Sequence, residues 1–302
     1  MTLKLGLIGS SEGNGHPFSW SAIFNGYDSA AMEMCGFPAI PRYLEKQSWP
    51  QDQAAGAAVT TVWTQSLELS RSIASAGKIP AVVENLEDMI GEVDGVLLAR
   101  DDSDTHFQLA APFLRAGLPV YIDKPIALSL RSLDGLYELE TRPGQIFTCS
   151  ALRHSQELTL SRRDKDNLGD LISIEAFAPK SWDKYAIHVV EPVLKLLPAG
   201  DRISSWSSSS IKPKASGEEL RTLTVLWVGG VETRFTTTGM NDTPILIKLK
   251  GTKGTQDLVF TDTFSAFRAA LQSFVNGIMG GTIESPRAFN EQVVDLLEKG
   301  RS

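Results

Sequence analysis

The sequence predicts an α/β protein in two parts, a parallel sheet followed by a larger and mainly antiparallel sheet. In the first part, short apolar segments and segments of helical spacing follow one another in turn. Within the apolar segments, polar and apolar residues do not alternate as they would in a half-exposed strand. In the second part, strand-like segments follow one another with few helices between them. The length of 302 residues agrees with about two domains.

The first part is expected to begin with a strand at residues 3–9 that ends in glycine, followed by a helix around residues 19–27. The helix after the strand at 93–100 would take Asp104 as its N-cap and Gly117 as its stop. The other expected elements of this part are strands at 57–63, 93–100 and 119–123 and helices at 66–77 and 104–117.

The second part is expected to form one large sheet. The pair Gly229-Gly230 is typical of a two-residue hairpin turn. Its strands are expected at residues 145–152, 171–178, 202–211, 220–228, 231–238, 244–250 and 256–260, with helices at 186–197, 264–278 and 285–300.

The composition excludes several classes of function. A net charge of −7 argues against a nucleic-acid surface. The two cysteines, Cys35 and Cys149, form neither a disulfide framework nor a metal-ligand spacing, so no metal site is expected. The N-terminal "MTLKLGLIGS" is interpreted as a first strand and not as a signal peptide, and no apolar run approaches the ~18 residues of a membrane span. A cytoplasmic protein is therefore expected.

A glycine-bearing loop, "GLIGSSEGNGHPF", joins the first strand to the first helix. Such a loop offers free backbone N–H groups to a phosphate, so Gly9, Ser10, Ser11 and Gly13 are candidate cofactor ligands. The spacing is not a regular G-x-G-x-x-G, and Glu12 would repel a pyrophosphate. A phosphate site and a simple turn both stay open at this point.

The second strand ends at Thr64, where a dinucleotide site usually places a carboxylate on the ribose. A neutral hydroxyl tolerates a 2′-phosphate, so either NAD or NADP is a candidate cofactor. Residues 28–56, before this strand, are an insertion relative to the usual spacing. They form either a lid or a surface elaboration.

Lys124 follows the strand at 119–123, and ligands of open α/β sheets bind beyond the carboxyl ends of the strands. A lysine there could point into the crevice, and the alternative is a surface ion pair with Asp123. Pro125 weakens that alternative because it restricts the backbone of Lys124. Of the histidines, His188 begins an amphipathic helix, where it could be a general base or a structural residue.

At this point the residues suggest a family. Asp123-Lys124-Pro125 is similar to the E-K-P motif that ends the fifth strand in the Gfo/Idh/MocA oxidoreductases. The upstream "LLARDDSDTHFQ" resembles that family's T-P-x-x-x-H turn, with His106 at the histidine and Asp102 near the missing proline. "KGTKGTQDL" at 250–258 and "FRAALQSFVNGI" resemble later elements of the family.

The resemblance implies a dinucleotide-binding Rossmann domain at residues 1–125 and a substrate-binding and oligomerisation domain at 126–302. It adds Asp102, His106 and Lys124 to the expected cofactor ligands, and it implies a homodimer or homotetramer. His188 matches the acid/base histidine of the family's D-x-x-x-H motif, but Lys184 stands where the aspartate would be.

The implied reaction is hydride transfer between a nicotinamide and a secondary alcohol or ketone of a sugar, cyclitol or related polyol. His188 would accept the proton, Lys124 would stabilise the alkoxide, and Tyr185 is a candidate second donor unless it only packs. The alternative is a dinucleotide- or sugar-binding sensor or assembly protein without redox turnover. A third possibility is an enzyme that uses a tightly held cofactor for non-redox or transient-redox chemistry. The aromatic and β-branched residues of "LRTLTVLWV" and "VETRFTTT" favour a symmetric dimer through an open face of the second sheet.

Overall fold

The computed structural model describes residues 2–212 and 219–302. The chain forms two compact units. The first unit comprises Met1–Ala127, Arg131–Cys149 and Phe267–Asn290, and the second comprises Leu128–Leu130, Ser150–Ala266 and Glu291–Ser302. The expected division after residue 125 lies near the first of these boundaries, but two later segments return to the first unit.

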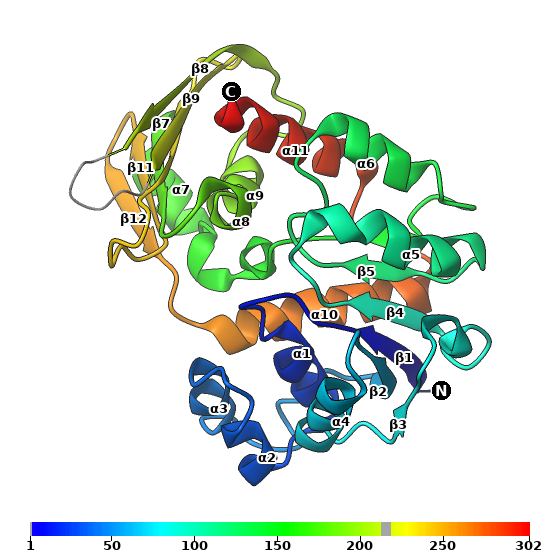
Figure 1. Ribbon diagram of the computed structural model, residues 1–302. Coiled ribbons are helices and arrows are strands. Elements are labelled where there is room, and N and C mark those ends of the chain that lie inside the picture. Colours follow the sequence, from blue (N-terminus) through cyan, green and yellow to red (C-terminus); the bar gives the residue numbers. More distant parts are fainter. Residues whose placement is uncertain (1, 213–218) are drawn as a thin grey trace. The chain divides into compact units, whose positions relative to one another are not determined.

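The first unit is built on a six-stranded sheet in which every pair of neighbours is parallel (Figure 1). The order β3-β2-β1-β4-β5-β6 is that of a dinucleotide-binding Rossmann sheet. Both faces of the central strands are covered, and Leu5, Leu7 and Ile8 have no exposed surface, which explains the absence of alternation in the sequence. The strands are β1 (Leu3–Ile8), β2 (Ala57–Trp63), β3 (Ala81–Val82), β4 (Gly95–Leu98), β5 (Val120–Ile122) and β6 (Ile146–Phe147).

The segment 145–152 was expected to be a strand of the second sheet, and this was wrong. Only Ile146–Phe147 is a strand, and it pairs with β5 in the first sheet. The reason is aromatic packing, because Phe147 contacts Tyr121 of β5 and Phe274 of α10 (Thr263–Gly280) at centroid distances of 4.6 and 5.6 Å. The same contacts place the residues of α10 from Phe267 onward in the first unit.

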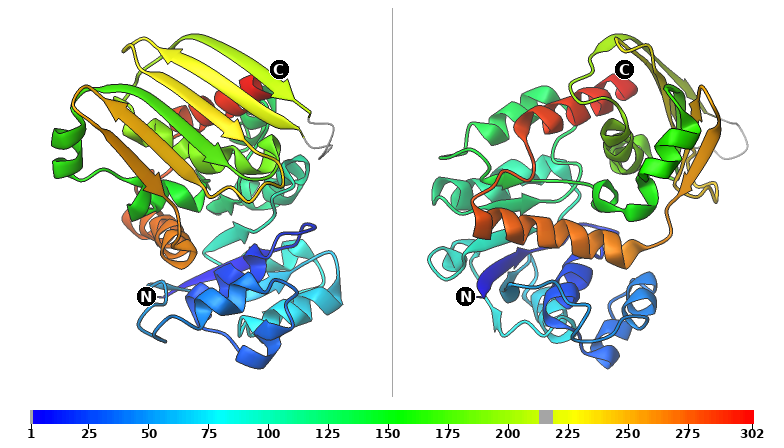
Figure 2. Two further views of the ribbon diagram at one scale, coloured as in Figure 1. Left: turned by 90° about the vertical axis from the view of Figure 1, so that its left-hand side faces the viewer. Right: turned by 180° about the vertical axis from the view of Figure 1, so that it is seen from behind.

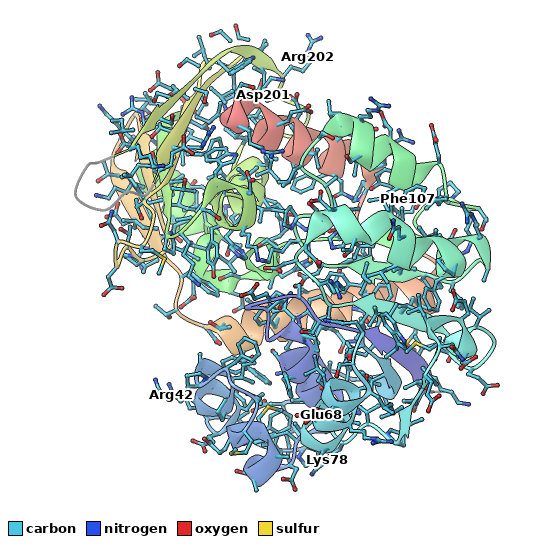
Figure 3. All side chains as sticks on the ribbon, viewed as in Figure 1. Arg42, Glu68, Lys78, Phe107, Asp201 and Arg202 are labelled. Atoms are coloured by element: carbon cyan, nitrogen blue, oxygen red, sulfur yellow. The ribbon has the colours of Figure 1, made fainter. Side chains whose placement is uncertain are left out.

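The helices of the first unit follow the expected order, with some differences at their ends. Asp104 is not the N-cap of α5 (His106–Arg115), because a 3-10 turn over Ser103–Thr105 comes first and Thr105 holds the cap position. The short helix α6 (Leu130–Tyr137) was not expected, and Leu130 itself belongs to the second unit. The remaining helices are α1 (His16–Asn25), α2 (Ser29–Glu33), α3 (Ala39–Leu44) and α4 (Leu67–Ala76), and exposed side chains such as those of Arg42 and Glu68 are labelled in Figure 3.

The insertion 28–56 carries α2 and α3 and packs against α1. The Tyr43 hydroxyl donates to Ser19 Oγ of α1 at 2.5 Å. A Cβ added at Gly15, just before α1, would lie 2.7 Å from Ile40 Cδ1 and 2.8 Å from Phe37 Cγ. Glycine at position 15 therefore permits the insertion to approach the end of the glycine loop closely.

The second unit contains a six-stranded sheet in the order β12-β11-β7-β10-β9-β8 (Figure 2). Only β7 and β10 are parallel neighbours, and the other pairs are antiparallel. The predicted hairpin at Gly229-Gly230 joins β9 to β10 and is confirmed. The strands are β7 (Leu171–Ala178), β8 (Ile203–Ile211), β9 (Leu220–Trp227), β10 (Glu232–Thr237), β11 (Leu246–Gly251) and β12 (Thr255–Val259).

Helix α9 packs on β7 and β11 and covers one face of this sheet. Trp227 and Phe235, the aromatic residues of the two segments expected to favour a dimer, are 1% and 0% exposed on the covered face. The register places Thr222, Thr224 and Leu226 on the other face. The aromatic residues therefore belong to the core and give no support to a dimer. The other helices of this unit are α7 (Arg162–Leu168), α8 (Trp182–Tyr185), α9 (Ile187–Leu196) and most of α11 (Arg287–Arg301).

No helix among the described residues is both long enough and apolar enough to cross a membrane.

We expect Gly300→Ala to destabilise the protein and Gly135→Ala to leave it as stable or more so. A Cβ at Gly300 of α11 would lie 1.9 Å from Cζ2 of the buried, rigid Trp182 ring, whereas a Cβ at Gly135 of α6 meets only Phe107 at 3.9 Å. Overpacking of this kind costs about 1–3 kcal/mol, and a helical glycine-to-alanine change otherwise gains up to about 1 kcal/mol. Urea unfolding of both variants checks this, and equal midpoints would contradict the placement of Trp182.

Candidate functional site

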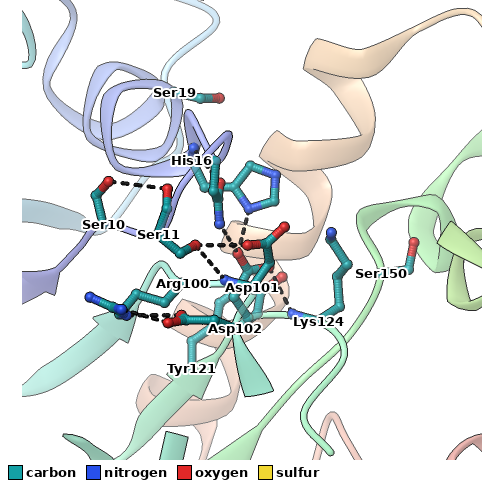
Figure 4. A network of polar contacts seen from close by, with 12 residues as sticks. Ser10, Ser11, His16, Ser19, Arg100, Asp101, Asp102, Tyr121, Lys124 and Ser150 are labelled. Atoms are coloured by element: carbon teal, nitrogen blue, oxygen red, sulfur yellow. Dashed lines mark hydrogen bonds and ion pairs between the residues drawn. The ribbon is translucent and has the colours of Figure 1, made fainter. Parts of the chain in front are cut away.

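One group of candidate residues lies in the first unit, at the carboxyl ends of the parallel strands. The loop after β1, the residues after β4 and the residues after β5 meet at this edge, where the strand order reverses between β1 and β4 (Figure 4). Open α/β sheets bind ligands at such a switch point. The position agrees with the one expected from the sequence.

The glycine loop is anchored to its neighbours by side-chain hydrogen bonds. Ser10 N donates to Gln65 Oε1 at 3.2 Å, and Gln65 Nε2 donates to Ser10 O at 2.9 Å. The Ser11 hydroxyl donates to Asp101 Oδ1 at 2.7 Å and accepts from Asp101 N at 3.1 Å. The candidate ligands Ser10 and Ser11 are therefore fixed to the residues that follow β2 and β4.

The tip of this loop has the properties of a phosphate site. Gly13 has a φ of 75° and an added Cβ there would meet no atom within 4 Å, so the backbone is open to an approaching group. No acceptor is found among the described residues for the N–H groups of Glu12 and Gly13. Free N–H donors before a helix fit the pyrophosphate of a dinucleotide, although the Glu12 carboxylate adds opposing charge.

Asp123 and Lys124 are buried together, with 1% and 5% of their surface exposed. Burial raises the pKa of Asp123, but the charge and hydrogen bond of His16, the charge of Lys124 and a bond from Asn14 outweigh it, so the pKa is lowered. Its carboxylate accepts from His16 Nδ1 at 2.5 Å, Asn14 Nδ2 at 3.0 Å and Lys124 N at 2.7 Å. The surface ion pair considered for Asp123 and Lys124 is therefore wrong.

Asp102, another expected cofactor ligand, is engaged by Arg100. Arg100 Nε lies 2.9 Å from Asp102 Oδ1 and Nη2 lies 2.5 Å from Oδ2, and Nη1 donates to Gln65 Oε1 at 3.1 Å. Burial raises the pKa of Asp102, yet the Arg100 hydrogen bonds and charge lower it overall. The Arg100 and Asp102 pair therefore places a positive and a negative charge beside Gln65, which follows β2.

Thr64 and His106 make contacts within the fold. The Thr64 hydroxyl donates to Ser66 O at 2.7 Å, and the residue is 4% exposed. The His106 ring has no exposed surface, and its two nitrogens lie 3.0 Å from Ile126 O and 2.8 Å from Arg100 O. Neither His106 nitrogen is left for a ligand. The ring instead joins the segment that follows β4 to the segment that follows β5.

A separate group of candidate residues surrounds His188 in the second unit. Its Nδ1 lies 2.8 Å from the Ser150 hydroxyl, and Ser150 N donates to Glu191 Oε2 at 3.0 Å. Glu191 is 1% exposed and its Oε2 lies 3.5 Å from Arg153 Nε. Burial raises the pKa of Glu191 to about 7, because the nearby charges of Arg153 and Lys195 and the bond from Ser150 offset it only in part.

Tyr185 lies between His188 and a lysine that sequence reasoning missed. Lys180 Nζ donates to the Tyr185 hydroxyl at 2.5 Å. The Tyr185 and His188 rings contact each other edge to face, with centroids 5.3 Å apart. Lys180 adopts a φ of 62°, which is uncommon for a side chain of this kind and marks a constrained backbone.

A cavity of about 520 Å³ adjoins this group in the second unit. Its charged lining residues include Lys180 and two ion-paired arginines, with Arg221 Nε 3.0 Å from Glu219 and Arg301 Nε 3.2 Å from Asp183. A polar cavity of this size could hold a sugar-sized molecule. Lys180 connects the cavity to the Tyr185 hydroxyl.

The contributors to these networks that were not predicted as site residues include His16, Ser150, Lys180 and Glu191. The pair of His188 and Glu191 at a spacing of three residues on an amphipathic helix was the available signal. Nothing in the sequence relates Ser150 to His188. No group of three or more potential metal ligands is found in the part of the chain that the structure describes.

Lys124 belongs to the first unit and His188 to the second. Their convergence on one substrate carbon stays a prediction.

We expect the wild-type protein to lose stability relative to Glu191→Gln as the pH rises from about 5 to about 8. The folded state holds a proton on Glu191 up to about pH 7, whereas the unfolded chain releases it near 4.5, so raising the pH in this window favours unfolding. Glutamine resembles the protonated acid and has no such proton to lose. The difference in unfolding free energy should change by on the order of 1 kcal/mol or more.

Urea unfolding of both proteins at several pH values measures this change. The pKa of His154 is lowered to about 3 by burial and by the charges of Arg153 and Lys195, so His154 destabilises the fold as the pH falls below about 6.5. This opposing trend is common to both proteins and cancels in their difference. Parallel pH profiles would contradict the prediction.

Comparison with known proteins provides an independent test of the fold. Residues 33–150 match the model of an oxidoreductase family with an NAD-binding Rossmann fold, GFO_IDH_MocA. No match was found among curated proteins.

Solved structures resemble almost the whole chain. Myo-inositol 2-dehydrogenase from Lactobacillus plantarum superposes with a TM-score of 0.76 at 13% identity, covering 99% of this chain and 96% of that one. Scyllo-inositol dehydrogenase from Lactobacillus casei, solved with NAD(H) and scyllo-inositol, gives 0.73 at 13% identity, covering 100% and 96%. UDP-N-acetylglucosamine 3-dehydrogenase from Acidithiobacillus ferrooxidans gives 0.73 at 14%, covering 100% and 97%. The predicted resemblance to the Gfo/Idh/MocA oxidoreductase family is thereby confirmed, by sequence over residues 33–150 and by fold over nearly all of the chain.

Proposed function

We propose that this protein is an NAD(P)-dependent oxidoreductase that transfers a hydride to or from a secondary alcohol or ketone of a sugar, cyclitol or related polyol. The observation that carries the proposal is the buried pair Asp123 and Lys124 at the carboxyl end of β5 in a Rossmann sheet. A buried lysine is costly unless it serves a purpose, and this edge of the sheet is where such folds bind their ligands.

The cofactor would be held by the first unit. The N–H groups near Glu12 and Gly13 would bind the pyrophosphate, with Gly9, Ser10 and Ser11 supporting the loop. The absence of a carboxylate on the ribose side of β2 is compatible with NAD or NADP, and Arg100 is the nearby cation. When bound, the nicotinamide supplies the chemistry of hydride transfer, which the side chains themselves lack.

The proton of the alcohol would be taken by His188. Ser150 Oγ contacts its Nδ1, so the ring is oriented with Nε2 as the group that exchanges the proton. Lys124 would stabilise the oxygen that becomes an alkoxide, because an ammonium in a poorly hydrated site interacts strongly with developing negative charge. Tyr185 would act as a second donor, and Lys180 Nζ, which donates to its hydroxyl, would hold that hydroxyl in place.

The substrate class rests on the fold and on the polar cavity. The similar structures include enzymes named for inositols and for a nucleotide sugar. The charged lining around Lys180, Arg221 and Arg301 suits a molecule rich in hydroxyl or acidic groups.

We also propose that the chain forms a homodimer or homotetramer through the uncovered face of the second sheet. This face bears threonine hydroxyls and the pair Arg234 and Glu175, 3.5 Å apart, so the contact would be polar. Both cysteines are free thiols, which suits the reducing cytoplasm, where we expect the protein to act.

We expect His188→Asn and Lys124→Ala to reduce kcat by about 100-fold or more, because each removes a group that acts on the reacting oxygen. The measurement is absorbance change with NAD⁺ or NADP⁺ and a panel of inositols, sugars and nucleotide sugars. Lys184→Ala is the control: Lys184 stands where the family has an aspartate, and its loss should leave turnover unchanged.

The same experiment separates an enzyme from a sensor. Binding of NADH or NADPH, followed by fluorescence, without turnover across the whole panel would favour a non-catalytic binding protein. Failure to bind either cofactor would contradict both functions.

We expect Tyr185→Phe to lower kcat by about 10-fold or more with little change in KM, if the phenol transfers a proton. Its ring would keep the contact with His188, so a purely packing role predicts unchanged kinetics. The pH dependence of kcat in the variant distinguishes these outcomes, because loss of a proton donor removes one limb of the profile.

A further inference from the structure

We propose that a small basic cavity in the second unit binds a phosphate-type dianion, which is either inorganic phosphate or the phosphate group of a phosphorylated metabolite. The cavity is lined by residues of the 3-10 turn η3 (Ala151–His154), of helix α7 and of the carboxyl-terminal half of α9 (Figure 1). The inference does not depend on the proposed function, because it concerns neither the dinucleotide nor the polyol.

The charged lining of this basic cavity is entirely positive. Arg153, Lys165 and Lys195 line it, and no acid is found among its lining residues in the described part of the chain. Three cations around a space of about 190 Å³ repel one another, and an anion between them removes that repulsion. The other lining residues are uncharged, and they are Leu158, Thr159, Leu160, Pro192 and Leu196.

Arg153 is the buried cation of the three. It is 6% exposed, and its Nε lies 3.5 Å from Glu191 Oε2. Lys195 Nζ donates to Arg153 O at 3.1 Å, so a second cation is held beside the same residue. The turn that carries Arg153 packs on α9. A guanidinium held in one orientation presents a planar set of donors that matches the oxygens of a phosphate.

Glu191 does not neutralise these cations. Its carboxyl is shared with the backbone, because Oε2 also accepts from Ser150 N at 3.0 Å. Burial raises the pKa of Glu191 to about 7, although the charges of Arg153 and Lys195 act in the opposite direction. Near neutral pH this acid is therefore ionised only in part, and the cations keep an excess of positive charge.

Two acids on the neighbouring segments are engaged by other groups. Asp164 Oδ2 accepts from the Ser161 hydroxyl at 2.6 Å, and Glu157 Oε2 accepts from Thr261 N at 2.7 Å. No ion pair of Lys165 with an acid is found among the described residues. The positive charge of the basic cavity is thus available to a ligand.

Isothermal titration calorimetry at about pH 8 tests the proposal, because a phosphate monoester carries close to two negative charges there. The probes are inorganic phosphate and phenyl phosphate, with ionic strength kept constant by sodium chloride so that general screening does not change. We expect a Kd on the order of 1 mM or below. Phenyl phosphate should bind more tightly, since its ring can contact the leucine and proline side chains, and the order of the two affinities identifies the source of the phosphate.

Three variants locate the bound phosphate. Lys165→Gln and Lys195→Gln should each weaken binding about 5-fold or more, and glutamine at 195 can still donate to Arg153 O. Arg163→Gln is the matched control, because it removes a positive charge from α7 two residues from Lys165, and residues at that spacing do not share a helix face. It should bind phosphate as the wild type does. Urea unfolding confirms that each variant folds.

Glu191→Gln separates a ligand site from a purely structural ion pair. At about pH 8 most of the Glu191 carboxyl is ionised and competes with the ligand for Arg153. Glutamine removes that charge and can still accept from Ser150 N, so phosphate affinity should rise about 3-fold or more. If Arg153 served only to hold Glu191, its removal would not tighten phosphate binding.

Three results would overturn the proposal. The first is a wild-type protein that binds neither phosphate at millimolar concentrations. The second is undiminished binding in Lys165→Gln and Lys195→Gln, which would place the phosphate elsewhere in the protein. The third is an equal loss in Arg163→Gln, which would indicate general attraction to a basic surface. None of these results bears on turnover of polyols, so the proposed function is tested separately.

Discussion

The hydrogen bonds of the buried Asp123 carboxylate are the interaction on which the candidate residues of the first unit depend. An ionised acid with 1% exposure is stable only if its oxygens are satisfied, and here the donors come from the loop after β1, from α1 and from the next backbone amide. The same bonds fix the glycine loop relative to β5 and hold Lys124 where it follows the strand. Asp123 thus couples the phosphate end of the site to the residue proposed to act on the substrate.

Asp123 and Glu191, the two carboxylates buried in the described part of the chain, behave in opposite ways. Asp123 has two cationic partners and a lowered pKa, whereas Glu191 is so desolvated that Arg153 only partly offsets the effect of burial, and its pKa rises to about 7. An ionised Asp123 polarises the imidazole of His16. Glu191 Oε2 accepts from Ser150 N, and the Ser150 hydroxyl contacts His188 Nδ1, so the raised pKa of Glu191 weakens the negative charge beside this pair.

Much of the fold followed from the sequence because it depends on local patterns. The β-branched run at 57–63 predicted β2 at its observed bounds, and Gly229-Gly230 predicted the hairpin between β9 and β10. The errors arose where a long-range contact decides the structure. The run at 145–152 has strand composition, but only the packing of Phe147 on Tyr121 and Phe274 assigns it to the first sheet. Likewise, alternation along β9 and β10 does not reveal which face α9 covers.

Site residues could be predicted only where the residue types of a motif, at their place in the fold, themselves indicate a chemical role. Asp123-Lys124-Pro125 was recognisable because a charged pair after a core strand needs an explanation, and burial of both residues supplies it. Thr64 and His106 were chosen by their place in a motif, but their polar atoms are bonded to Ser66, Ile126 and Arg100. His16 had no motif to identify it. Its importance arises from Asp123, which is 107 residues away in the chain. A sequence can indicate which side chains are able to do acid–base chemistry, but the pairing that selects one nitrogen of one imidazole is a property of the folded unit.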